Sequence, residues 1–402
     1  MKQRVTALLK RMKLAGGTDK VKILLDATVL QEPVTGVARA MLGLYTACAA
    51  LQPDLRVVAL HRKALRCNLP DRIGSRRLAP YLPAVLWRHL AIPAYTSLKR
   101  ADVIHFPWNG GVTWVPRPTL VVLTLHDVIP AALPCLYFQT EQEEENYRKR
   151  VQRNLDLADL VITDSECSKR DILAHFRLKR DPVVVYLANL LLTRSLDGIE
   201  KPLTSQGYFL YVGGYERRKG LESLVREYQR LHAAREIGIP LVLAGEPQHV
   251  SDALKATISA AKSEGSIIER GYVTDHELAC LLQNARALIY PSLHEGFGYP
   301  PLEAMAQGCP VITTRVSSMP EICGEAALYV APGDSEGLAS AILEMDRNAE
   351  LRLKLSRMGR ERAALFTWEK SAKKYLETLE DIRPRNAVAG SVDNPPNVND
   401  GS

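Results

Sequence analysis

Short, continuously apolar runs alternate with longer segments of helical periodicity along almost the whole chain, and this alternation restricts the possible folds more than any other feature. Strands that are apolar on both faces and separated by helices form parallel sheets with helices on each side. The alternation occurs in two consecutive series, so the sequence predicts an α/β protein with two doubly wound, Rossmann-like domains. The expected strands cover 21–26, 56–60, 102–106, 119–125, 159–163 and 183–187 in the first series, and 208–213, 240–244, 267–270, 287–290, 310–313 and 327–330 in the second.

The division into domains follows from the length and from one polar stretch. A chain of 402 residues is long enough for two ordinary domains. A stretch containing Pro202 and Gly207 separates the two series, and we place the linker at 190–206. The expected units are a basic N-terminal segment 1–20, a first domain 21–195, a second domain 196–367, a C-terminal helix 368–384 that packs back towards the first domain, and a disordered tail 385–402.

The segment 290–314 (YPSLHEGFGYPPLEAMAQGCPVITT) joins a strand end to a helix through a loop rich in glycine and proline. Glycines let the backbone approach a ligand closely, and prolines suit a first helical turn whose free N–H groups attract anions. Glu295 lies in the loop and Glu303 in the helix, at the edge where open α/β sheets bind nucleotides. A carboxylate there can accept two hydrogen bonds from a ribose diol. A helix start that is merely stabilised by an acidic residue is the alternative.

A second strand end, in 211–221 (YVGGYERRKGL), carries glycines followed by three basic residues. Backbone N–H groups with a Lys and an Arg at a strand–helix turn can form a diphosphate cradle. The glycine patterns of P-loops and of dinucleotide-binding folds are both missing, and a solvated basic turn is the alternative.

Two further candidates lie in the first series. His126 directly follows the strand 119–125 and would face the cleft between the domains, as a hydrogen-bonding or proton-handling group or as a structural histidine. Gly36 lies in the loop between the first strand and the helix 36–51. This loop could hold an anion or a sugar at the helix start, or simply open the helix.

Together these segments resemble the large family of retaining, GT-B-fold glycosyltransferases that use nucleotide-sugar donors, over about residues 21–382. The segment HEGFGYPPLEAMAQGCPVITT is similar to the family's signature of two glutamates separated by seven residues, here Glu295 and Glu303. The following VSSMPEICGEAALYVAPGD is similar to its continuation in members that transfer mannose or related hexoses. LHD at 125–127 resembles the donor-site histidine, and DSECSKRDIL at 164–173 resembles the segment after the fifth strand.

The resemblance implies a role for each matching residue. Glu303 would bind the ribose hydroxyls, and Glu295 would hold hydroxyls of the donor sugar. The amides of Gly296, Phe297 and Gly298 would also contact the donor sugar, and His126 would lie near this sugar from the opposite domain. Tyr272 and Val273 would bind the base. The residues implied to contact the diphosphate are Lys219, Arg218, Gly214 and Gly36.

The family also implies a mechanism in which the anomeric configuration is retained. Lys219, Arg218 and a helix N-terminus would stabilise the leaving diphosphate without a metal ion, and no Asp-x-Asp motif occurs. We expect front-face departure and attack, with the leaving phosphate helping to deprotonate the acceptor. The chain departs from the family at Gly214, where many members have Arg, so that Arg218 or else Arg217 must supply the second positive charge. It also lacks the usual Asn-Gly before the linker.

Other functions use parts of the same pattern. A glycoside hydrolase also needs two carboxylates, but here both lie in one loop–helix unit of a nucleotide-type domain. A non-catalytic nucleotide-sugar-binding module would need a reason for lost activity, and none is visible. A dinucleotide oxidoreductase lacks its glycine fingerprint. We therefore expect a nucleotide-sugar donor, with GDP-mannose as first choice from the VSSMPE segment, a glycan or lipid-linked acceptor, and no cofactor besides the donor.

The net charge of +7 is concentrated in the domain expected to bind the acceptor, since residues 1–100 hold 18 Lys and Arg against 5 Asp and Glu. The segment 69–100 mixes basic and aromatic side chains, which suits an anionic membrane surface as well as a solvated domain face with ordinary core aromatics. Nucleic acid is the least expected partner. The residues concerned are Arg72, Arg76, Arg77, Arg88, Lys99 and Arg100, with Tyr81, Trp87 and Tyr95.

The seven cysteines include no Cys-x-x-Cys pair, so that neither a disulfide framework nor a zinc site is expected. The sequence contains no run of eighteen apolar residues, so no transmembrane helix is expected. We expect a cytoplasmic protein that associates peripherally with the cytoplasmic face of the membrane.

Overall fold

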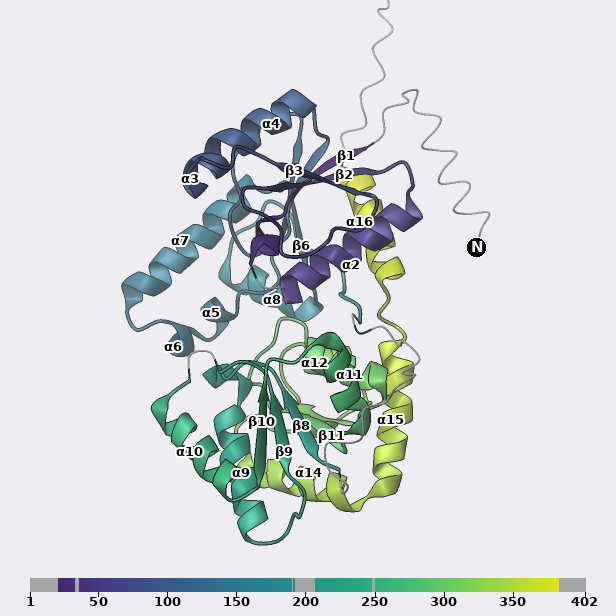
Figure 1. Cartoon of the computed structure of the whole chain (residues 1–402). Coiled ribbons are helices and arrows are strands. Elements are labelled where there is room, and N and C mark those ends of the chain that lie inside the picture. The colour runs from purple at the N-terminus through teal and green to yellow at the C-terminus, as the bar shows by residue number, and fades with distance from the viewer. Residues whose placement is uncertain (1–20, 33–35, 190, 192–206, 248–249, 383–402) are drawn as a thin grey trace, which may run out of the picture.

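The computed structural model describes residues 21–32, 36–189, 191, 207–247 and 250–382, and these form two domains, one above the other in Figure 1. The first domain contains a seven-stranded parallel sheet in the order β3-β2-β1-β4-β5-β6-β7. The second contains a six-stranded parallel sheet in the order β10-β9-β8-β11-β12-β13. The prediction of two doubly wound α/β domains is confirmed. The expected basic segment 1–20, almost all of the expected linker and the expected tail 385–402 lie outside the described residues.

The elements of the first domain are β1 (Lys22–Asp26), η1 (Thr28–Gln31), α2 (Gly36–Leu51), β2 (Arg56–His61), β3 (Ile73–Arg77), α3 (Ala84–Leu86), η2 (Trp87–Ala91), α4 (Ile92–Lys99), β4 (Val103–Phe106), β5 (Leu120–Thr124), α5 (Ile129–Ala132), α6 (Pro134–Tyr137), α7 (Glu141–Leu157), β6 (Leu160–Thr163), α8 (Glu166–His175) and β7 (Val183–Val184). Those of the second are β8 (Phe209–Val212), η3 (Arg217–Lys219), α9 (Leu221–Ala233), β9 (Leu241–Ala244), α10 (Asp252–Ser263), β10 (Ile267–Gly271), α11 (Asp275–Asn284), β11 (Ala287–Tyr290), α12 (Tyr299–Gln307), β12 (Val311–Thr314), α13 (Met319–Cys323), β13 (Leu328–Val330), α14 (Ser335–Arg347) and α15 (Ala349–Ala363). The last helix is α16 (Trp368–Ile382).

The strand order of each sheet reverses beside its first strand, and this reversal locates the site. In the second sheet β8 pairs with both β9 and β11, so that Leu210 lies between Val242 and Leu288. Loops that leave the carboxyl ends of two such neighbouring strands diverge to opposite faces and leave a crevice for a ligand. The loops after β8 and β11 are the two motif segments of the second domain. The first sheet has the same arrangement at β1, between β2 and β4.

Strand β3 is the one strand, among those described, that the apolar pattern does not predict. It lies at the edge of the first sheet, and only Ile73 among its residues is buried. Edge strands often carry charged side chains, which prevent pairing with another chain. The absence of an apolar run therefore concealed β3.

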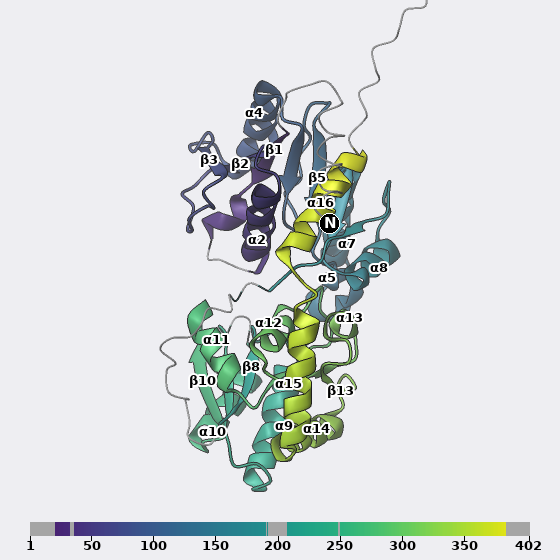
Figure 2. The ribbon, with the colours of Figure 1, turned by 90° about the vertical axis from the view of Figure 1, so that its right-hand side faces the viewer.

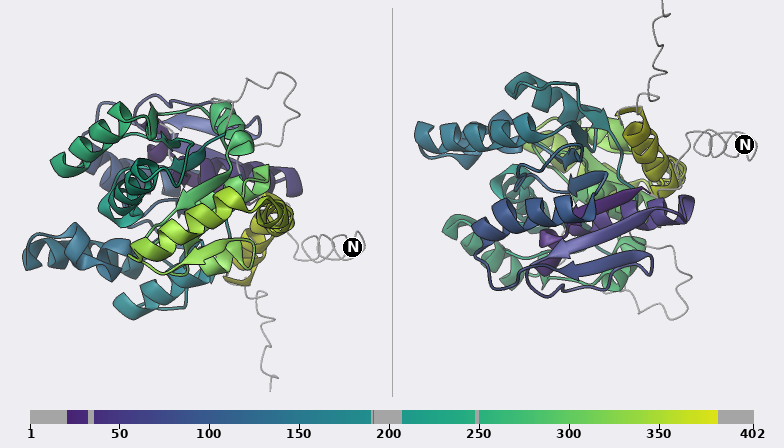
Figure 3. Two further views of the ribbon diagram at one scale, coloured as in Figure 1. Left: turned by 90° about the horizontal axis from the view of Figure 1, so that it is seen from below. Right: turned by 90° about the horizontal axis from the view of Figure 1, so that it is seen from above.

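The last helix returns to the first domain, as Figure 2 shows, with α15 against the second domain and α16 against the first. In the end-on views of Figure 3, α16 (yellow) lies beside α2 (purple). The Tyr375 hydroxyl lies 2.8 Å from that of Tyr45, which in turn lies 2.7 Å from Nδ1 of buried His105. A Cβ at Gly43 would overlap the ring of Trp368, so α2 has a glycine where the first side chain of α16 packs against it. This packing ties the end of the second domain to the first.

The segment 69–100 differs from the expected surface at two aromatic positions. Trp87 is only 2% exposed and donates from Nε1 to the carbonyl oxygen of Leu78, so it is a core residue. Tyr95 is half-buried. The guanidinium group of Arg88 lies 5.5 Å from the ring centroid of Trp108. At Trp87 the structure agrees with the alternative of a solvated face with ordinary core aromatics, because a buried tryptophan with a satisfied N–H looks the same in sequence as an interfacial one.

Candidate active site

The loops after β8 and β11 meet at the carboxylate of Glu295. Nζ of Lys219 and one guanidinium nitrogen of Arg218 each lie 2.7 Å from Oε1 of Glu295. The hydroxyls of Tyr290 and Ser292 donate to the same oxygen, also at 2.7 Å. Glu295 and Lys219 are buried, at 7% and 9% exposure. Two cations and one carboxylate thus form a hydrogen-bonded cluster at the switch point of the second sheet.

The electrostatics of this cluster keep Glu295 ionised. Burial would raise the pKa of Glu295, but the charges of Lys219 and Arg218 and hydrogen bonds from Lys219 and Ser292 outweigh it and lower the pKa to about 2. Burial also lowers the pKa of Lys219, an effect that the Glu295 carboxylate opposes. Glu295 is the carboxylate that both cations contact directly, and the charge of Glu216 also acts on both of them. A Lys and an Arg at such a turn can bind an anionic ligand such as a diphosphate.

The loop after β11 touches the first domain at Gly296. A Cβ here would lie 2.8 Å from Cβ of Asp127 and 3.1 Å from the carbonyl oxygen of His126. The hydroxyls of Ser165 and Ser168 donate to the Gly296 carbonyl oxygen at 2.6 and 3.0 Å. A glycine is therefore required by the close approach of the two domains.

Phe297 and Gly298, the next two residues, can contact a ligand only through their backbone groups. The Phe297 side chain is 5% exposed and packs edge-on against the rings of Tyr299 and Phe366. Gly298 has a φ of 110°, which favours glycine, and precedes the first turn of α12. A side chain at Gly298 would also overlap Met319.

Glu303 on α12 has its charged partner in the opposite domain. It is 4% exposed, and a guanidinium nitrogen of Arg39, from α2, lies 3.5 Å from its Oε1. Arg39 also forms an ion pair with Asp275. Burial raises the pKa of Glu303 to about 7, although Arg39 opposes this. The start of α2 faces α12 as well, since a Cβ at Gly36 would lie 3.6 Å from the ring of Tyr299.

His126 is held by acceptors at both ring nitrogens. Nδ1 lies 2.6 Å from Oδ2 of Asp164, and Nε2 lies 3.2 Å from the carbonyl oxygen of Pro107. Burial lowers the pKa of His126, but the charge and hydrogen bond of Asp164 outweigh it, so the pKa is raised overall. Two acceptors require two N–H donors, so this geometry favours the imidazolium form.

The remaining predicted residues lie farther along the carboxyl edge. Gly214 is in the turn after β8, where its carbonyl oxygen accepts from the Tyr211 hydroxyl at 2.6 Å. Tyr272 follows β10 and is 66% exposed, whereas Val273 packs against the second-domain core. Since β9 separates β10 from β8, these two residues are one strand removed from the charged cluster.

Four residues of this site were not predicted from the sequence: Arg39, Asp164, Tyr290 and Ser292. Tyr290 and Ser292 lie inside the motif segment 290–314, and their place at a strand end was the available signal. Asp164 also directly follows a strand, β6. Arg39 is an ordinary basic residue of a helix, and no sequence signal distinguishes it.

Two Rossmann-like domains whose carboxyl edges meet at such a cluster are the architecture of GT-B glycosyltransferases. The family described as "Glycosyl transferases group 1" matches residues 206–348, and "Glycosyltransferase Family 4" matches residues 34–186. The chain belongs to the GT-B glycosyltransferases.

Among curated proteins, the O-antigen chain mannosyltransferase B of Escherichia coli is 29% identical over 87% of this chain and 97% of its own length. The chain matches only 33% of the length of the longer serotype-specific mannosyltransferase WbdA of E. coli, at 25% identity over 65% of this chain. Among solved structures, the sucrose-phosphate synthase of Thermosynechococcus elongatus has a TM-score of 0.68 at 21% identity, covering 90% of this chain and 99% of that chain. Anabaena HepE, solved with UDP and glucose, has a TM-score of 0.66 at 16% identity, covering 90% of this chain and 100% of that chain. At these identities the structures support the fold alone.

Proposed function

We propose that the protein transfers a hexose, with mannose as first choice, from a nucleoside-diphosphate sugar to a hydroxyl group of a glycan or lipid-linked acceptor, in polysaccharide or glycoconjugate biosynthesis. The observation that carries this proposal is the convergence of Lys219 and Arg218 on Glu295 at the switch point of the second sheet. The mannosyl donor is suggested by the names of the E. coli relatives and by the segment that contains VSSMPE. GDP-mannose is the donor to test first.

In the proposed reaction the donor diphosphate binds Lys219, Arg218 and the turn at Gly214, and these groups stabilise the negative charge that develops as the glycosidic C–O bond breaks. A phosphate oxygen accepts the proton of the acceptor hydroxyl, which attacks the same face, so that configuration is retained. Glu295 accepts hydrogen bonds from sugar hydroxyls, and Glu303 from the ribose diol. The cationic cluster supplies the charge stabilisation, and this mechanism requires no metal ion.

The role of His126 is to orient the donor from the first domain. Its carbonyl oxygen lies beside Gly296, and its imidazole is held by Asp164 and Pro107. An imidazolium with both N–H groups engaged has no lone pair with which to remove a proton. We therefore propose that His126 positions the sugar and adds positive charge, and does not act as the base.

The glycoside hydrolase alternative is disfavoured by the charge state of Glu295. Such an enzyme needs one carboxyl group with a raised pKa that donates a proton to the leaving oxygen. Lys219 and Arg218 instead hold the pKa of Glu295 at about 2. Glu303 has the raised pKa, but its partner is Arg39.

An acceptor linked to lipid would bring the enzyme to a membrane surface. No helix among the described residues has the length and hydropathy needed to span a bilayer. The segment around α3 and α4 carries a set of exposed apolar side chains next to exposed Lys99 and Arg100. We propose that this α3–α4 face contacts anionic lipid at the cytoplasmic surface. Its apolar members are Tyr81, Val85, Leu86, Leu90 and Leu98.

A donor panel tests the function directly. The melting temperature is measured with UDP-, GDP- and ADP-sugars. Sugars of one nucleotide should raise it, and GDP-mannose should be among them. NMR of the product should show the α or β configuration of the donor retained. Stabilisation by no nucleotide sugar, together with release of sugar from a simple glycoside, would overturn the proposal.

A second experiment tests the membrane contact. The triple substitution Val85→Ser, Leu90→Ser and Leu98→Ser should reduce co-sedimentation with vesicles that contain anionic lipid, and leave transfer to a soluble acceptor analogue intact. Leu353→Ser is the matched control, because Leu353 is 74% exposed but lies on α15 of the second domain. Equal vesicle binding by the triple variant and the control would contradict the contact.

A further inference from the structure

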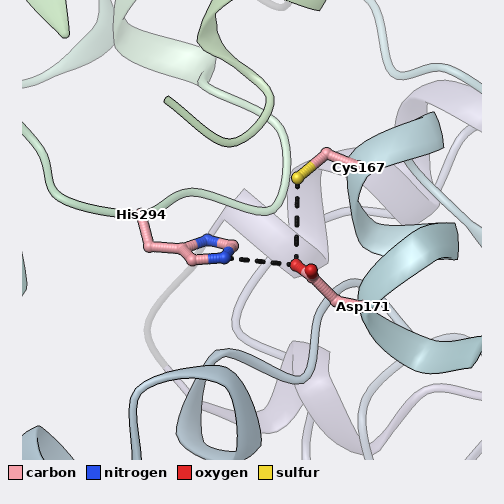
Figure 4. Close-up of side chains that lie close together, drawn as sticks. All are labelled: Cys167, Asp171 and His294. Carbon is pink, nitrogen blue, oxygen red and sulfur yellow. Dashed lines mark hydrogen bonds and ion pairs between the residues drawn. The ribbon is translucent and has the colours of Figure 1, made fainter. Parts of the chain in front are cut away.

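Three potential metal ligands from the two domains meet at the loop after β11 (Figure 4). Cys167 and Asp171 lie one turn apart on α8 of the first domain, and His294 precedes Glu295 in the loop after β11 of the second. They form the one group of three or more Cys, His, Asp and Glu ligands with atoms within 4.8 Å of one another in the described part of the chain. The sequence concealed this group because its members are 127 positions apart and none belongs to a Cys-x-x-Cys pair.

The spacing of the ligand atoms matches a small tetrahedral ion. Nε2 of His294 lies 3.2 Å from Oδ2 of Asp171, and the Cys167 thiol donates to the same oxygen at 3.8 Å. Zinc bonded to sulfur, nitrogen and oxygen at its usual lengths places its ligand atoms about 3.4–3.6 Å apart. All three ligand atoms lie within 4.8 Å of one another, so side-chain shifts of about 1 Å would enclose an ion between them.

The ligand chemistry selects the metal. A thiolate with an imidazole and a carboxylate is a donor set for Zn²⁺, whereas Mg²⁺ and Ca²⁺ require oxygen ligands. The Glu321 carboxylate lies next to the Cys167 backbone, where it accepts from the N–H groups of Glu166 and Cys167. This adds a negative charge near the cation.

We propose that Cys167, Asp171 and His294 bind one Zn²⁺ across the domain interface and thereby hold the two domains in the arrangement seen here. The thiol loses its proton to solvent as the Zn–S bond forms, and a water molecule fills the fourth coordination position. The ion does not take part in sugar transfer.

The site is built for reversible rather than permanent occupancy. Nδ1 of His294 is buried and has no hydrogen-bond partner among the described residues, so the imidazole lacks the second-shell acceptor that strengthens structural zinc sites. The ligands also come from two domains, and separation of the domains breaks the site. Domain opening and product release limit turnover in many enzymes, so an ion that ties α8 to the Glu295 loop is expected to slow turnover.

The experiment measures metal binding and activity separately. The chelator-treated, untagged full chain is titrated with Zn²⁺ for stoichiometry and with Co²⁺ for the charge-transfer absorption that only a thiolate ligand produces. Cys167→Ser is the test variant, and Cys135→Ser is the matched control because Cys135 is an exposed free cysteine outside the group. Both variants should keep the transfer activity of the metal-free wild type.

The expected result is one zinc per chain and a cobalt–thiolate band in the wild type and in Cys135→Ser, with both lost in Cys167→Ser. Zinc should reduce transfer at least tenfold in the wild type, chelator should restore it, and Cys167→Ser should be insensitive. Equal zinc binding and cobalt absorption in all three proteins would overturn the proposal. The inhibition assay rests on the proposed transfer activity, but the binding assays do not, so failure of one does not imply failure of the other.

Discussion

Nζ of Lys219 lies 2.7 Å from Oε1 of Glu295, and these two buried side chains come from the two loops that flank the switch point of the second sheet. Each of the two side chains neutralises the charge of the other, which explains why one loop has a basic residue at 219 and the other an acidic residue at 295. A buried carboxylate without a cation, or a buried cation without an anion, would be costly. In the proposed reaction, the donor diphosphate would therefore share Lys219 with Glu295.

The first prediction concerns donor affinity. Lys219→Ala and Arg218→Ala should each weaken binding of the nucleotide sugar by about 10- to 150-fold, since a hydrogen bond to a charged group contributes about 1.5–3 kcal/mol. Isothermal titration of the nucleoside diphosphate measures this. Arg217→Ala is the control, because Arg217 is exposed in the same turn and outside the cluster. Equal affinities in all three variants would remove the cluster from the donor site.

The second prediction concerns acid stability. The pKa of Glu295 is about 2 in the folded protein against an ordinary 4.5, so its ionised form stabilises the fold above pH 4.5. That contribution, about 3 kcal/mol, should be lost as pH falls through the folded pKa. Urea unfolding of Glu295→Gln should show a lower midpoint at pH 7 and a smaller loss of stability on acidification. Glu361→Gln, exposed on α15, should behave like the wild type.

The third prediction concerns the pH dependence of donor binding. Burial holds the pKa of Glu303 near 7, so the carboxylate that should accept the ribose hydroxyls is protonated at lower pH. Donor affinity should therefore rise as pH increases through about 7. Arg39→Gln should move this midpoint to higher pH, because the charge of Arg39 lowers the pKa. Affinity that stays constant from pH 6 to 8 would exclude Glu303 from the ribose site.

The residues that sequence reasoning found and missed differ in a physical way. Glu295, Lys219 and Gly296 lie in strand-end loops whose glycine, proline and charge content departs from ordinary loops, so a local pattern identified them. Arg39 contacts Glu303 across the domain interface, and Asp164 contacts His126 from the end of the neighbouring strand. Both roles depend on distances that no local pattern encodes. The same limit applies to the zinc ligands on α8 and the β11 loop.

The fold itself was predictable to a greater degree. Helix α2 covers the predicted residues 36–51, and α16 (Trp368–Ile382) begins at the first residue of the predicted helix 368–384. Strand β3 was missed because it is stabilised by pairing with β2 and not by burial. For Trp87 the sequence left a membrane-facing and a core position both open, since burial depends on the tertiary neighbours that receive the side chain.

The fourth prediction concerns Asp164 as a positioning residue for His126. Asp164→Asn keeps the shape but removes the charge that holds the pKa of His126 up against the effect of burial. The pKa of His126, followed by NMR, should fall, and kcat should decrease about tenfold or more with little change in the donor KM. Asp181→Asn, at an exposed carboxylate, is the control. A loss of kcat without any change in the pKa would point to a purely structural role.

The last prediction concerns the contact between the domains. In Gly296→Ala the added Cβ would lie 2.8 Å from Cβ of Asp127 and 3.1 Å from a carbonyl oxygen, neither of which can rotate away. The second domain should fold normally, but the domains should close less completely, and the hydrogen bonds from Ser165 and Ser168 should be lost. With donor bound, small-angle scattering should show a larger radius of gyration for Gly296→Ala than for the wild type. The kcat of the variant should be lower by about tenfold or more. Gly238→Ala is the matched control, because a Cβ there meets nothing within 4 Å. Wild-type kcat and compactness in Gly296→Ala would mean that catalysis does not depend on this approach of the two domains.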